Sequence, residues 1–506
     1  MTTISANERA GTITLSLISH TNAGKTTLAR TLLAQDVGEV RDAAHVTTEA
    51  TEYTLIETAD GDRLALWDTP GFGDSARLAR RLAQESKPIV WFLAQMWDRF
   101  RDRAFFLSQQ AVRNVRDRAD VVLYLVNASE HPADAGYLAS ELAVLEWMQK
   151  PVLVLLNQTG PLEAPHARPA ERPRPASGER GDDDDLTRWR TALADRPLVR
   201  DVIAFDAFAR CWVQEFTLFG AIGPLLSADH AAPFARLVAA WRSRRFDQLD
   251  SSMRALAAAI ASAACTRVAV PRTAMLRKLG SALGVGDDPA SRDAARAMAQ
   301  LAQRASTDLR TATDEIIALY GLSGRAAAEV EAHIEADIAR EGPLDEGKAA
   351  AMGGVVSGAL AGLAADLATG GLTLGAGMLT GAVVGALGGA GFARALNVAR
   401  GQSEDVVRWD DAFIERLIVQ ALLRYLAVAH YGRGRGNFVE AESPALFRAQ
   451  LAAAMASRQQ QLAAIFAQRV PQCDTQAFAN ALTPVLRDIT LAVLAKLYPD
   501  TLPDAS

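Results

Sequence analysis

The chain has 506 residues, of which 49% are hydrophobic and 22% are charged, a composition typical of a folded globular protein. It is too long for one hydrophobic core, so we expect about two or three domain-sized units. The formal net charge of -6 excludes a general electrostatic attraction to nucleic acid or anionic lipid, and any such contact needs a local basic patch.

The N-terminal part of the chain alternates between strand and helix patterns. A strand pattern at 12–18 is followed by a helical pattern at 25–34, and the turn sequence ADGD joins two further strand patterns in a predicted hairpin. The remaining predicted elements are a helix at 134–149 and strands at 51–58, 63–67, 121–126, 151–156 and 199–205. Strands that alternate with helices in this way predict a parallel α/β sheet.

Two insertions interrupt this pattern. Residues 75–119 hold more helix-forming sequence than a simple α/β domain needs. Residues 161–185 are rich in Pro, Arg and Asp and end in four consecutive aspartates. Such a segment lacks the apolar surface that ordering requires, so we expect a disordered surface loop there.

After about residue 207 the strand patterns end, and Ala, Leu, Arg and Gln recur with helical spacing up to residue 497. We therefore expect a second, all-helical domain, with boundaries at 1–225 and 226–506 for the two domains. Predicted breaks between helices lie at Pro271, Pro289, Gly321, Gly342, 432–436 and Pro471.

The three cysteines are Cys211, Cys265 and Cys473. They are far apart and have no CxxC or Cys/His spacing, so we expect neither a disulfide framework nor a zinc site, but buried reduced thiols. No basic region precedes an apolar run at the N-terminus, so no secretory signal is expected. The predicted location is the cytoplasm or the inner face of the cytoplasmic membrane.

The segment 19–27 fits the Walker A pattern, in which backbone N–H groups surround the phosphates, a lysine reaches the outer phosphates and a hydroxyl holds Mg²⁺. Gly24, Lys25 and Thr26 supply the last three positions, while Ser19 replaces the first glycine. The strand before this segment and the helix after it support a nucleotide site. The candidate nucleotide-binding residues are Ser19, His20, Thr21, Asn22, Ala23, Gly24, Lys25, Thr26 and Thr27.

The sequence DTPG at 68–71 is a second motif, and it ends a predicted strand. Asp68 can hold Mg²⁺ through water, and the N–H of Gly71 can sense a γ-phosphate. Between the motifs, Thr48 or, as second choice, Thr47 can complete the Mg²⁺ shell, although either can equally be an ordinary loop threonine. The candidate metal ligands are Thr26, Thr48 and Asp68.

The series NAGKTT, HVTTEA and WDTPGFGD resembles the translation-factor-related GTPases of the Era and TrmE type, which carry NxGKS/T, TT and DTPG in this order. The resemblance covers roughly the first 220 residues. It implies a three-layer P-loop G domain with a mostly parallel sheet that binds GTP and Mg²⁺ and hydrolyses GTP. The segment 75–119 and the sequence LLNQTGP also look like a bacterial family of such GTPases joined to a helical domain of unknown function, a wider resemblance that covers the whole chain.

The guanine-reading motif of this class, NKxD, is altered here. The matching stretch is NQTG at 157–160, so the carboxylate that pairs with the guanine edge is missing. Asn157 and Gln158 remain candidate base contacts, but ATP binding or relaxed specificity stays open. The resemblance places a second base-contacting loop at Phe205, Asp206 and Ala207.

The position that carries a water-orienting glutamine in Ras-like enzymes is Phe72 here. In several members of the Era and TrmE type, a P-loop asparagine helps to bind K⁺, and Asn22 stands at that position unless it is only a turn residue. The resemblance therefore implies K⁺-stimulated hydrolysis, with Asp74 as a candidate for positioning water. The candidate catalytic residues are Asn22, Lys25, Thr48 and Asp74.

Residues 349–393 carry a single charge, Asp366, and two ladders of glycines spaced four apart. This spacing puts each ladder on one helix face, where helices can approach closely. The length allows two membrane spans, but Ala and Gly give little insertion free energy and Asp366 is unfavourable unless it lies at a hairpin tip. Membrane insertion or docking and a buried glycine-zipper hairpin in a soluble domain both stay open.

The sequence supports three hypotheses of function. In the first, GTP hydrolysis reorders 41–53 and 72–119, and the helical domain transmits this change to an unknown protein effector. The second is a nucleotide-gated, membrane-associated scaffold with little turnover, and the third is an RNA- or ribosome-related GTPase. A homodimer is a further candidate assembly. The arginines that could contact RNA or lipid phosphates, unless they form a solvated helix face, are Arg236, Arg242, Arg244, Arg245, Arg433 and Arg435.

Overall fold

The computed structural model describes residues 11–20, 23–33, 51–69, 75–83, 103–157, 182–205, 211–271, 289–322, 404–431, 444–470, 472–499 and 501–502. The chain divides into two compact units. The N-terminal unit comprises 1–246, 429–443 and 498–506, and the helical unit comprises 247–428 and 444–497. The domain boundary predicted at 225–226 stays a prediction.

A six-stranded sheet in the order β2-β3-β1-β4-β5-β6 forms the centre of the N-terminal unit. Its strands are β1 (Thr12–Ser19), β2 (Thr51–Glu57), β3 (Arg63–Asp68), β4 (Val121–Asn127), β5 (Val152–Asn157) and β6 (Val199–Ala204). β2 runs antiparallel to β3, and all other neighbours are parallel. The predicted mostly parallel sheet is confirmed, and each strand begins and ends within one residue of its predicted bounds.

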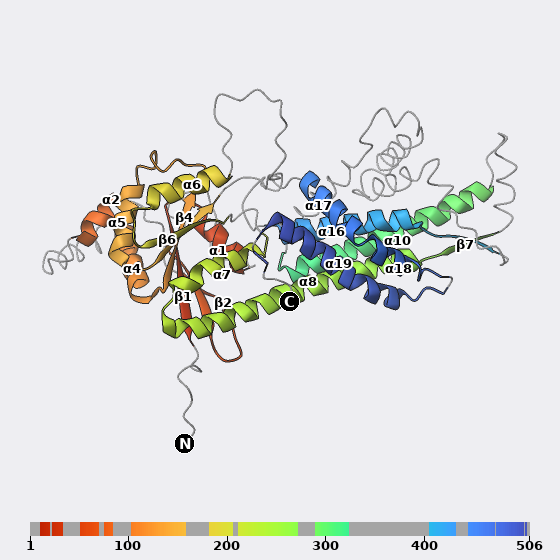
Figure 1. Ribbon diagram of the computed structural model, residues 1–506, viewed down its shortest axis with the longest axis horizontal. Coiled ribbons are helices and arrows are strands. Elements are labelled where there is room, and N and C mark those ends of the chain that lie inside the picture. The colour runs from red at the N-terminus through yellow and green to blue at the C-terminus, as the bar shows by residue number, and fades with distance from the viewer. Residues whose placement is uncertain are drawn as a thin grey trace, which may run out of the picture. The chain divides into compact units, whose positions relative to one another are not determined.

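Helices cover both faces of this sheet, as Figure 1 shows. Successive residues of β4 point to opposite faces, so Leu123 belongs to one hydrophobic core and Tyr124 to the other. The first core includes residues of α1 (Lys25–Leu33), α7 (Gln214–Ile222) and α8 (Ala228–Cys265), and a short 3-10 helix η3 (Gly223–Leu225) joins α7 to α8. The second core includes residues of α2 (Ser75–Ala83), α4 (Arg103–Arg118), α5 (Leu138–Met148) and α6 (Asp182–Leu193). The three-layer arrangement is therefore confirmed.

The hairpin β2–β3 is tied to the N-terminal half of α8 through its turn. Gly61 has a φ of 84°, a left-handed conformation that glycine adopts readily. The next residue, Asp62, is fully buried and accepts a hydrogen bond from the backbone N–H of Gly11 at 2.9 Å. Arg236 of α8 donates to both carboxylate oxygens of Asp62, at 2.6 and 3.0 Å. This bidentate pair fixes where α8 lies against the end of the hairpin.

The two predicted insertions have different outcomes. In 75–119 the described residues form α2 and α4, as the helix-forming sequence predicts. The prediction of a disordered loop at 161–185 is wrong for its last four residues, because α6 begins at Asp182. Carboxylates near a helix N-terminus interact favourably with the helix dipole, and buried Asp185 also pairs with Arg188. The other residues of that segment lie outside the described ranges.

Helices form most of the described part of the helical unit, as expected. After the C-terminal half of α8 they are α10 (Pro289–Leu319), α16 (Asp411–Ala429), α17 (Pro444–Ser457), α18 (Gln459–Phe466) and α19 (Thr475–Leu497). Two predicted breaks are confirmed, since Pro289 begins α10 and Gly321 follows its end with a φ of 67°. α8 and α19 are joined by an ion pair between Asp250 and Arg487 at 2.7 Å.

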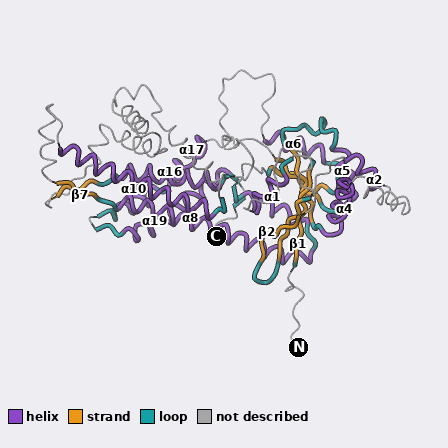
Figure 2. The backbone as a smooth tube through the Cα atoms, turned by 180° about the vertical axis from the view of Figure 1, so that it is seen from behind, coloured by secondary structure: helices purple, strands orange, loops and turns teal. Residues whose placement is uncertain are grey.

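This unit also contains two short strands that the sequence did not predict. β7 (Val268–Pro271) and β8 (Glu404–Val407) pair in antiparallel fashion. Figure 2 draws this ribbon in orange, with the label β7, next to α10 of the same unit. Each strand is only four residues long and its partner lies far away in the sequence, so no local period marks either one.

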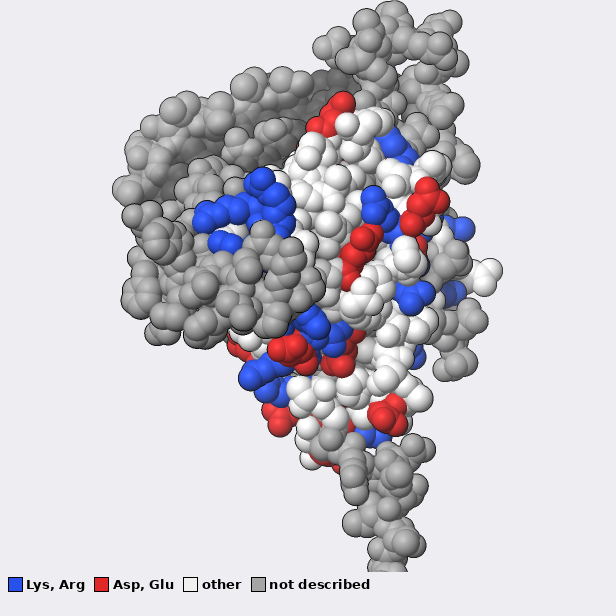
Figure 3. Space-filling view, turned by 90° about the vertical axis from the view of Figure 1, so that its left-hand side faces the viewer, with Lys and Arg blue, Asp and Glu red and all other residues white. Residues whose placement is uncertain are grey.

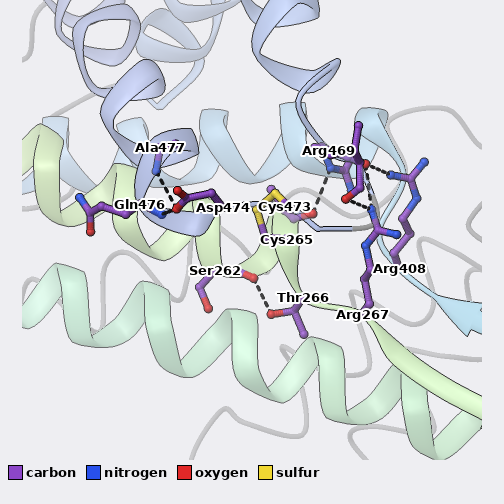
Figure 4. Close-up of a disulfide and its surroundings, with 12 residues drawn as sticks. Ser262, Cys265, Thr266, Arg267, Arg408, Arg469, Cys473, Asp474, Gln476 and Ala477 are labelled. Carbon is purple, nitrogen blue, oxygen red and sulfur yellow. Dashed lines mark hydrogen bonds between the residues drawn. A yellow bond between two sulfur atoms is a disulfide. The ribbon is translucent and has the colours of Figure 1, made fainter.

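Two of the three cysteines form a disulfide, so the prediction of reduced thiols is wrong for this pair. Cys265, the last residue of α8, forms a disulfide with Cys473, which lies just before α19 (Figure 4). Their Cα atoms are 5.4 Å apart, although 208 positions separate them in the sequence. Only the fold brings them together, so spacing in the sequence could not show the pair. Cys211 is free and buried, as predicted.

The predicted glycine-zipper hairpin at 349–393 lies outside the described residues. Among the residues that are described, α19 is one helix with the length and apolarity to span a membrane, with a mean hydropathy of 1.3. Half of its most apolar window is buried inside the protein, and core helices of soluble proteins have the same properties. α19 is therefore weak evidence for a membrane contact.

Candidate nucleotide-binding site

The candidate site lies where neighbouring parallel strands end. Ser19 is the last residue of β1, Asp68 of β3 and Asn157 of β5. Because these strands are parallel, their carboxyl ends meet at one edge of the sheet, the usual place for ligands in open α/β folds. The sheet thus brings together residues from three separate motifs of the sequence.

The loop before α1 has the backbone geometry of a phosphate cradle where it is described. Gly24 has a φ of 92°, a backbone conformation that residues other than glycine rarely adopt. The only non-glycine residue with positive φ in the described ranges is Gln149, so Ser19 replaces the first Walker glycine without left-handed backbone strain. α1 begins directly after this glycine, at Lys25, and a helix N-terminus is a favourable place for an anion.

Lys25 is held near the entry of this loop. Its Nζ donates to the hydroxyl of Ser19 at 3.1 Å. Burial lowers the pKa of Lys25, and the negative charges of Asp68 and then Glu141 act in the opposite direction. The Lys25 side chain therefore has the Ser19 hydroxyl as an acceptor and two carboxylates that favour its charged form.

The hydroxyl of Thr26 donates to Oδ2 of Asp68 at 3.0 Å. Asp68 is 3% exposed, and burial raises its pKa, while Lys25 and the hydrogen bond from Thr26 lower it. Its other oxygen, Oδ1, is buried and has no hydrogen-bond partner. A hydroxyl beside a buried carboxylate with one unsatisfied oxygen fits the hard-oxygen preference of Mg²⁺ or of a water in its shell.

Asp68 is fixed by the residue that follows it. The hydroxyl of Thr69 donates to the carbonyl of Leu17 in β1 at 2.7 Å, and the backbone N–H of Thr69 reaches the same carbonyl at 3.4 Å. Both groups are buried, so this anchor holds the start of the DTPG segment against the strand that leads into the cradle.

Asn157 braces the cradle from β5. Its side-chain amide donates to the carbonyl of Ala23 at 2.9 Å, and the residue is fully buried. The first residue of the altered NKxD motif thus contacts the phosphate loop directly. Whether it also contacts a base stays a prediction.

A polar cluster beside His20 was not predicted from the sequence. Nδ1 of His20 lies 2.6 Å from Oε1 of Glu141 in α5, and the hydroxyl of Tyr124 donates to Oε2 at 2.5 Å. The His20 ring stacks on Tyr137 with centroids 3.9 Å apart. One signal was present, because Glu141 stands among the apolar positions of the predicted helix 134–149.

α5 also contacts the helix that follows the DTPG segment. The hydroxyls of Ser75, the first residue of α2, and Ser140 lie 2.7 Å apart. Ser140 neighbours Glu141, so one stretch of α5 supports both the cradle and the start of α2.

Two family models match the chain. Residues 14–158 match the model described as 50S ribosome-binding GTPase. Residues 190–482, more than half of the chain, match the model described as Domain of unknown function (DUF3482). The chain belongs to the DUF3482 family. Its N-terminal unit is a GTP-binding domain of the P-loop GTPase class, fused to the helical region, which confirms the resemblance seen in the sequence.

Solved structures also resemble parts of this DUF3482 chain. An Era variant from Aquifex aeolicus bound to GDP and AlF4⁻ has 17% identity and a TM-score of 0.28, over 43% of this chain and 57% of that one. Toc33 from Arabidopsis thaliana with Mg²⁺ and GMPPNP has 13% identity and a TM-score of 0.25, over 40% of this chain and 73% of that one. The chain spans 57% and 58% of the length of the two Era structures that it matches. TM-scores this low give no evidence about its ligands, and no curated protein matches it.

Several predicted site residues of the DUF3482 chain lie outside the described ranges. They are Thr21, Asn22, Thr47, Thr48, Gly71, Asp74, Gln158, Asp206 and Ala207. Phe205 is described, and its side chain is 1% exposed in the core beneath the sheet. A base contact at Phe205 would therefore have to come from its backbone.

The arginines of the basic stretch in α8 have internal partners. Arg236 pairs with buried Asp62, and Arg245 donates to both oxygens of Glu215 at 2.7 and 2.8 Å. Arg244 lies over the ring of Trp241, 4.2 Å from its centroid. Arg245 is buried, so the prediction that it contacts phosphates or lies on a solvated face is wrong for this residue. Arg236 keeps 32% of its side chain exposed, so for it the prediction stays open. Figure 3 shows described basic and acidic side chains largely interspersed on one face of the molecule, with one group of Lys and Arg apart from them.

Proposed function

We propose that the chain is a Mg²⁺-dependent GTPase that works as a molecular switch. The observation that carries this proposal is the grouping of Lys25, Thr26 and the unsatisfied buried oxygen of Asp68 at one edge of the sheet. Two motifs 42 residues apart in the sequence supply this group, which supports a site for phosphate and a cation.

The residues have distinct roles in this proposal. The N–H groups at the start of α1 and the ammonium of Lys25 bind the phosphates, and Asn157 keeps the loop in shape by holding the Ala23 carbonyl. Thr26 and Asp68 would hold Mg²⁺, with Thr48 as the candidate third ligand. When bound, the ion neutralises phosphate charge.

Guanine is the proposed base because the N-terminal unit matches a GTPase family model. Direct support from the base-reading stretch is missing, since NQTG at 157–160 lacks the carboxylate. A pocket that forms fewer hydrogen bonds to the edge of the base discriminates less strongly between guanine and adenine. We therefore expect a preference for GTP that is weaker than that of enzymes with an intact NKxD motif.

Hydrolysis is proposed to depend on K⁺ through Asn22, with Asp74 positioning water. In this account hydrolysis reorders 41–53 and 72–119, and the helical unit transmits the change to an effector. Phosphate release measured in K⁺ and in Na⁺ buffers tests whether hydrolysis depends on K⁺. Equal rates in both buffers would remove K⁺ from the mechanism, and the absence of turnover would favour a nucleotide-gated scaffold.

The proposed function is tested by titrating the full chain with GMPPNP and with its adenine counterpart, each with Mg²⁺ and with EDTA. We expect Mg²⁺-dependent binding that the variant Lys25→Ala loses. Glu146→Gln is a suitable control, since Glu146 lies on α5, partly exposed, and pairs with Arg196 rather than with the cradle.

A further inference from the structure

His20 is held at the entry of the cradle by two contacts. It follows Ser19, where the Walker pattern has its first glycine and where the chain leaves β1. Its ring stacks on Tyr137 with an interplanar angle of 12°, and its Nδ1 lies 2.6 Å from Oε1 of Glu141. The ring keeps partial exposure, 34% of the side chain, whereas the glutamate is fully buried.

Glu141 is in turn fixed from inside the protein. Its second oxygen accepts a hydrogen bond from Tyr124, which is fully buried in β4. A buried carboxylate is costly unless both oxygens have partners, and Tyr124 and His20 provide one partner each. The carboxylate is therefore a rigid point to which the loop can be attached.

The pair acts at the point where the chain leaves β1 and enters the cradle. His20 directly follows Ser19, the last residue of β1, and Glu141 belongs to α5, so their contact joins the start of the loop to a helix. A hydrogen bond to an ionised carboxylate is stronger than one between neutral groups. We propose that His20 and Glu141 form a positioning pair that fixes the entry of the cradle. This inference rests on the proposed function, because the fixed loop is the one that would bind the triphosphate.

The alternative is that His20 matters only through its ring, which packs on Tyr137. Two substitutions separate these roles. His20→Asn places an amide nitrogen where Nδ1 is, so it keeps the hydrogen bond and loses the stacking. His20→Phe keeps an aromatic ring for stacking and loses the hydrogen bond.

The experiment is hydrogen–deuterium exchange of the nucleotide-free full chain, read from peptides that cover 17–24, together with affinity for Mg²⁺–GMPPNP. We expect His20→Ala to speed exchange in these peptides about tenfold and to weaken GMPPNP binding about tenfold. His20→Phe is expected to behave like His20→Ala, and His20→Asn like the wild type. Glu146→Gln on the same helix serves as the control and should change neither readout.

The outcomes separate this inference from the proposed function. If His20→Phe matches the wild type, or if His20→Asn is no better than His20→Ala, the positioning pair is refuted and ring packing explains the contact. If the exchange pattern is as expected but the wild type binds no GMPPNP, the positioning of the loop stands and the proposed function fails.

Discussion

The hydroxyl of Thr26 donates to Oδ2 of Asp68 at 3.0 Å, while Oδ1 of the same buried carboxylate has no partner. Thr26 comes from the P-loop and Asp68 from the end of β3, so the parallel pairing of β1 with β3 brings the two motifs together. A carboxylate left partly unsatisfied inside a protein needs a reason, and the cation of the proposed function, with its water shell, would supply one.

Asp68→Asn tests this explanation, because it keeps the shape of the side chain and removes its charge. We expect Mg²⁺-dependent affinity for GMPPNP to fall about 10- to 100-fold, while binding in EDTA changes little. Isothermal titration at several Mg²⁺ concentrations measures both. An equal loss with and without Mg²⁺ would show that Asp68 supports the loop rather than the ion.

Asn157→Ala is expected to weaken the binding of guanine and adenine nucleotides equally, by about tenfold. The reason is that its amide braces the Ala23 carbonyl of the cradle, and in the proposed function the cradle binds the phosphates and not the base. Competition between GMPPNP and its adenine counterpart measures the ratio of the two affinities. A loss confined to the guanine nucleotide would show that Asn157 reads the base.

The sequence predicted the sheet well because β4 and β5 are continuous apolar runs that are buried on both faces, and β1 alternates Ile and Leu with Thr and Ser. The Walker and DTPG residues were also predicted, because each group belongs to a short motif of neighbouring residues. The His20–Glu141 pair was not, because 121 positions separate its members and a glutamate on a helix carries no local sign of its partner.

Long separation in the sequence also hid the pairing of β7 with β8 in the helical unit. Most of the unit's sequence lies between these two strands, and each strand is too short to show an alternating pattern. Asp182 belongs to a charge run that is typical of disorder, yet it begins a helix whose later residue Trp189 is fully buried in the core. Burial of one face outweighed composition there.

Reduction of the Cys265–Cys473 disulfide is expected to lower the free energy of unfolding by about 2–5 kcal/mol. The bond closes a long loop, with a sequence separation of 208, and so restricts the unfolded chain. Denaturant unfolding with and without a phosphine reductant measures the difference. Cys265→Ser with Cys473→Ser is the control, in which the reductant should have no effect. Free thiols at both Cys265 and Cys473 in the untreated protein, located by mass spectrometry, would contradict the bond.

The ion pair of Asp62 and Arg236 is expected to make stability depend on pH. The hydrogen bond from Arg236 and that from the Gly11 N–H hold the pKa of Asp62 below its ordinary value against the effect of burial. A carboxyl with a lowered folded pKa stabilises the protein above its unfolded pKa, and this contribution is lost as the pH falls through the folded pKa.

The stability difference between the wild type and Asp62→Asn should therefore be largest near neutral pH and shrink below about pH 4. Urea unfolding of both proteins at a series of pH values measures it. Asp201→Asn, which removes an exposed pair with Arg190, is a matched control with little expected effect at any pH. A difference that stays constant down to acidic pH would contradict the lowered pKa.

The central claim is that residues 19–27 bind a guanine nucleoside triphosphate with Mg²⁺, and direct titration of the full chain tests it. We expect GMPPNP to bind about tenfold more tightly than the adenine counterpart, and Lys25→Ala to weaken GMPPNP about 100-fold or more while leaving the fold intact by circular dichroism. GMPPNP binding that is unchanged in Lys25→Ala, or no binding by the wild type in Mg²⁺, would contradict the account.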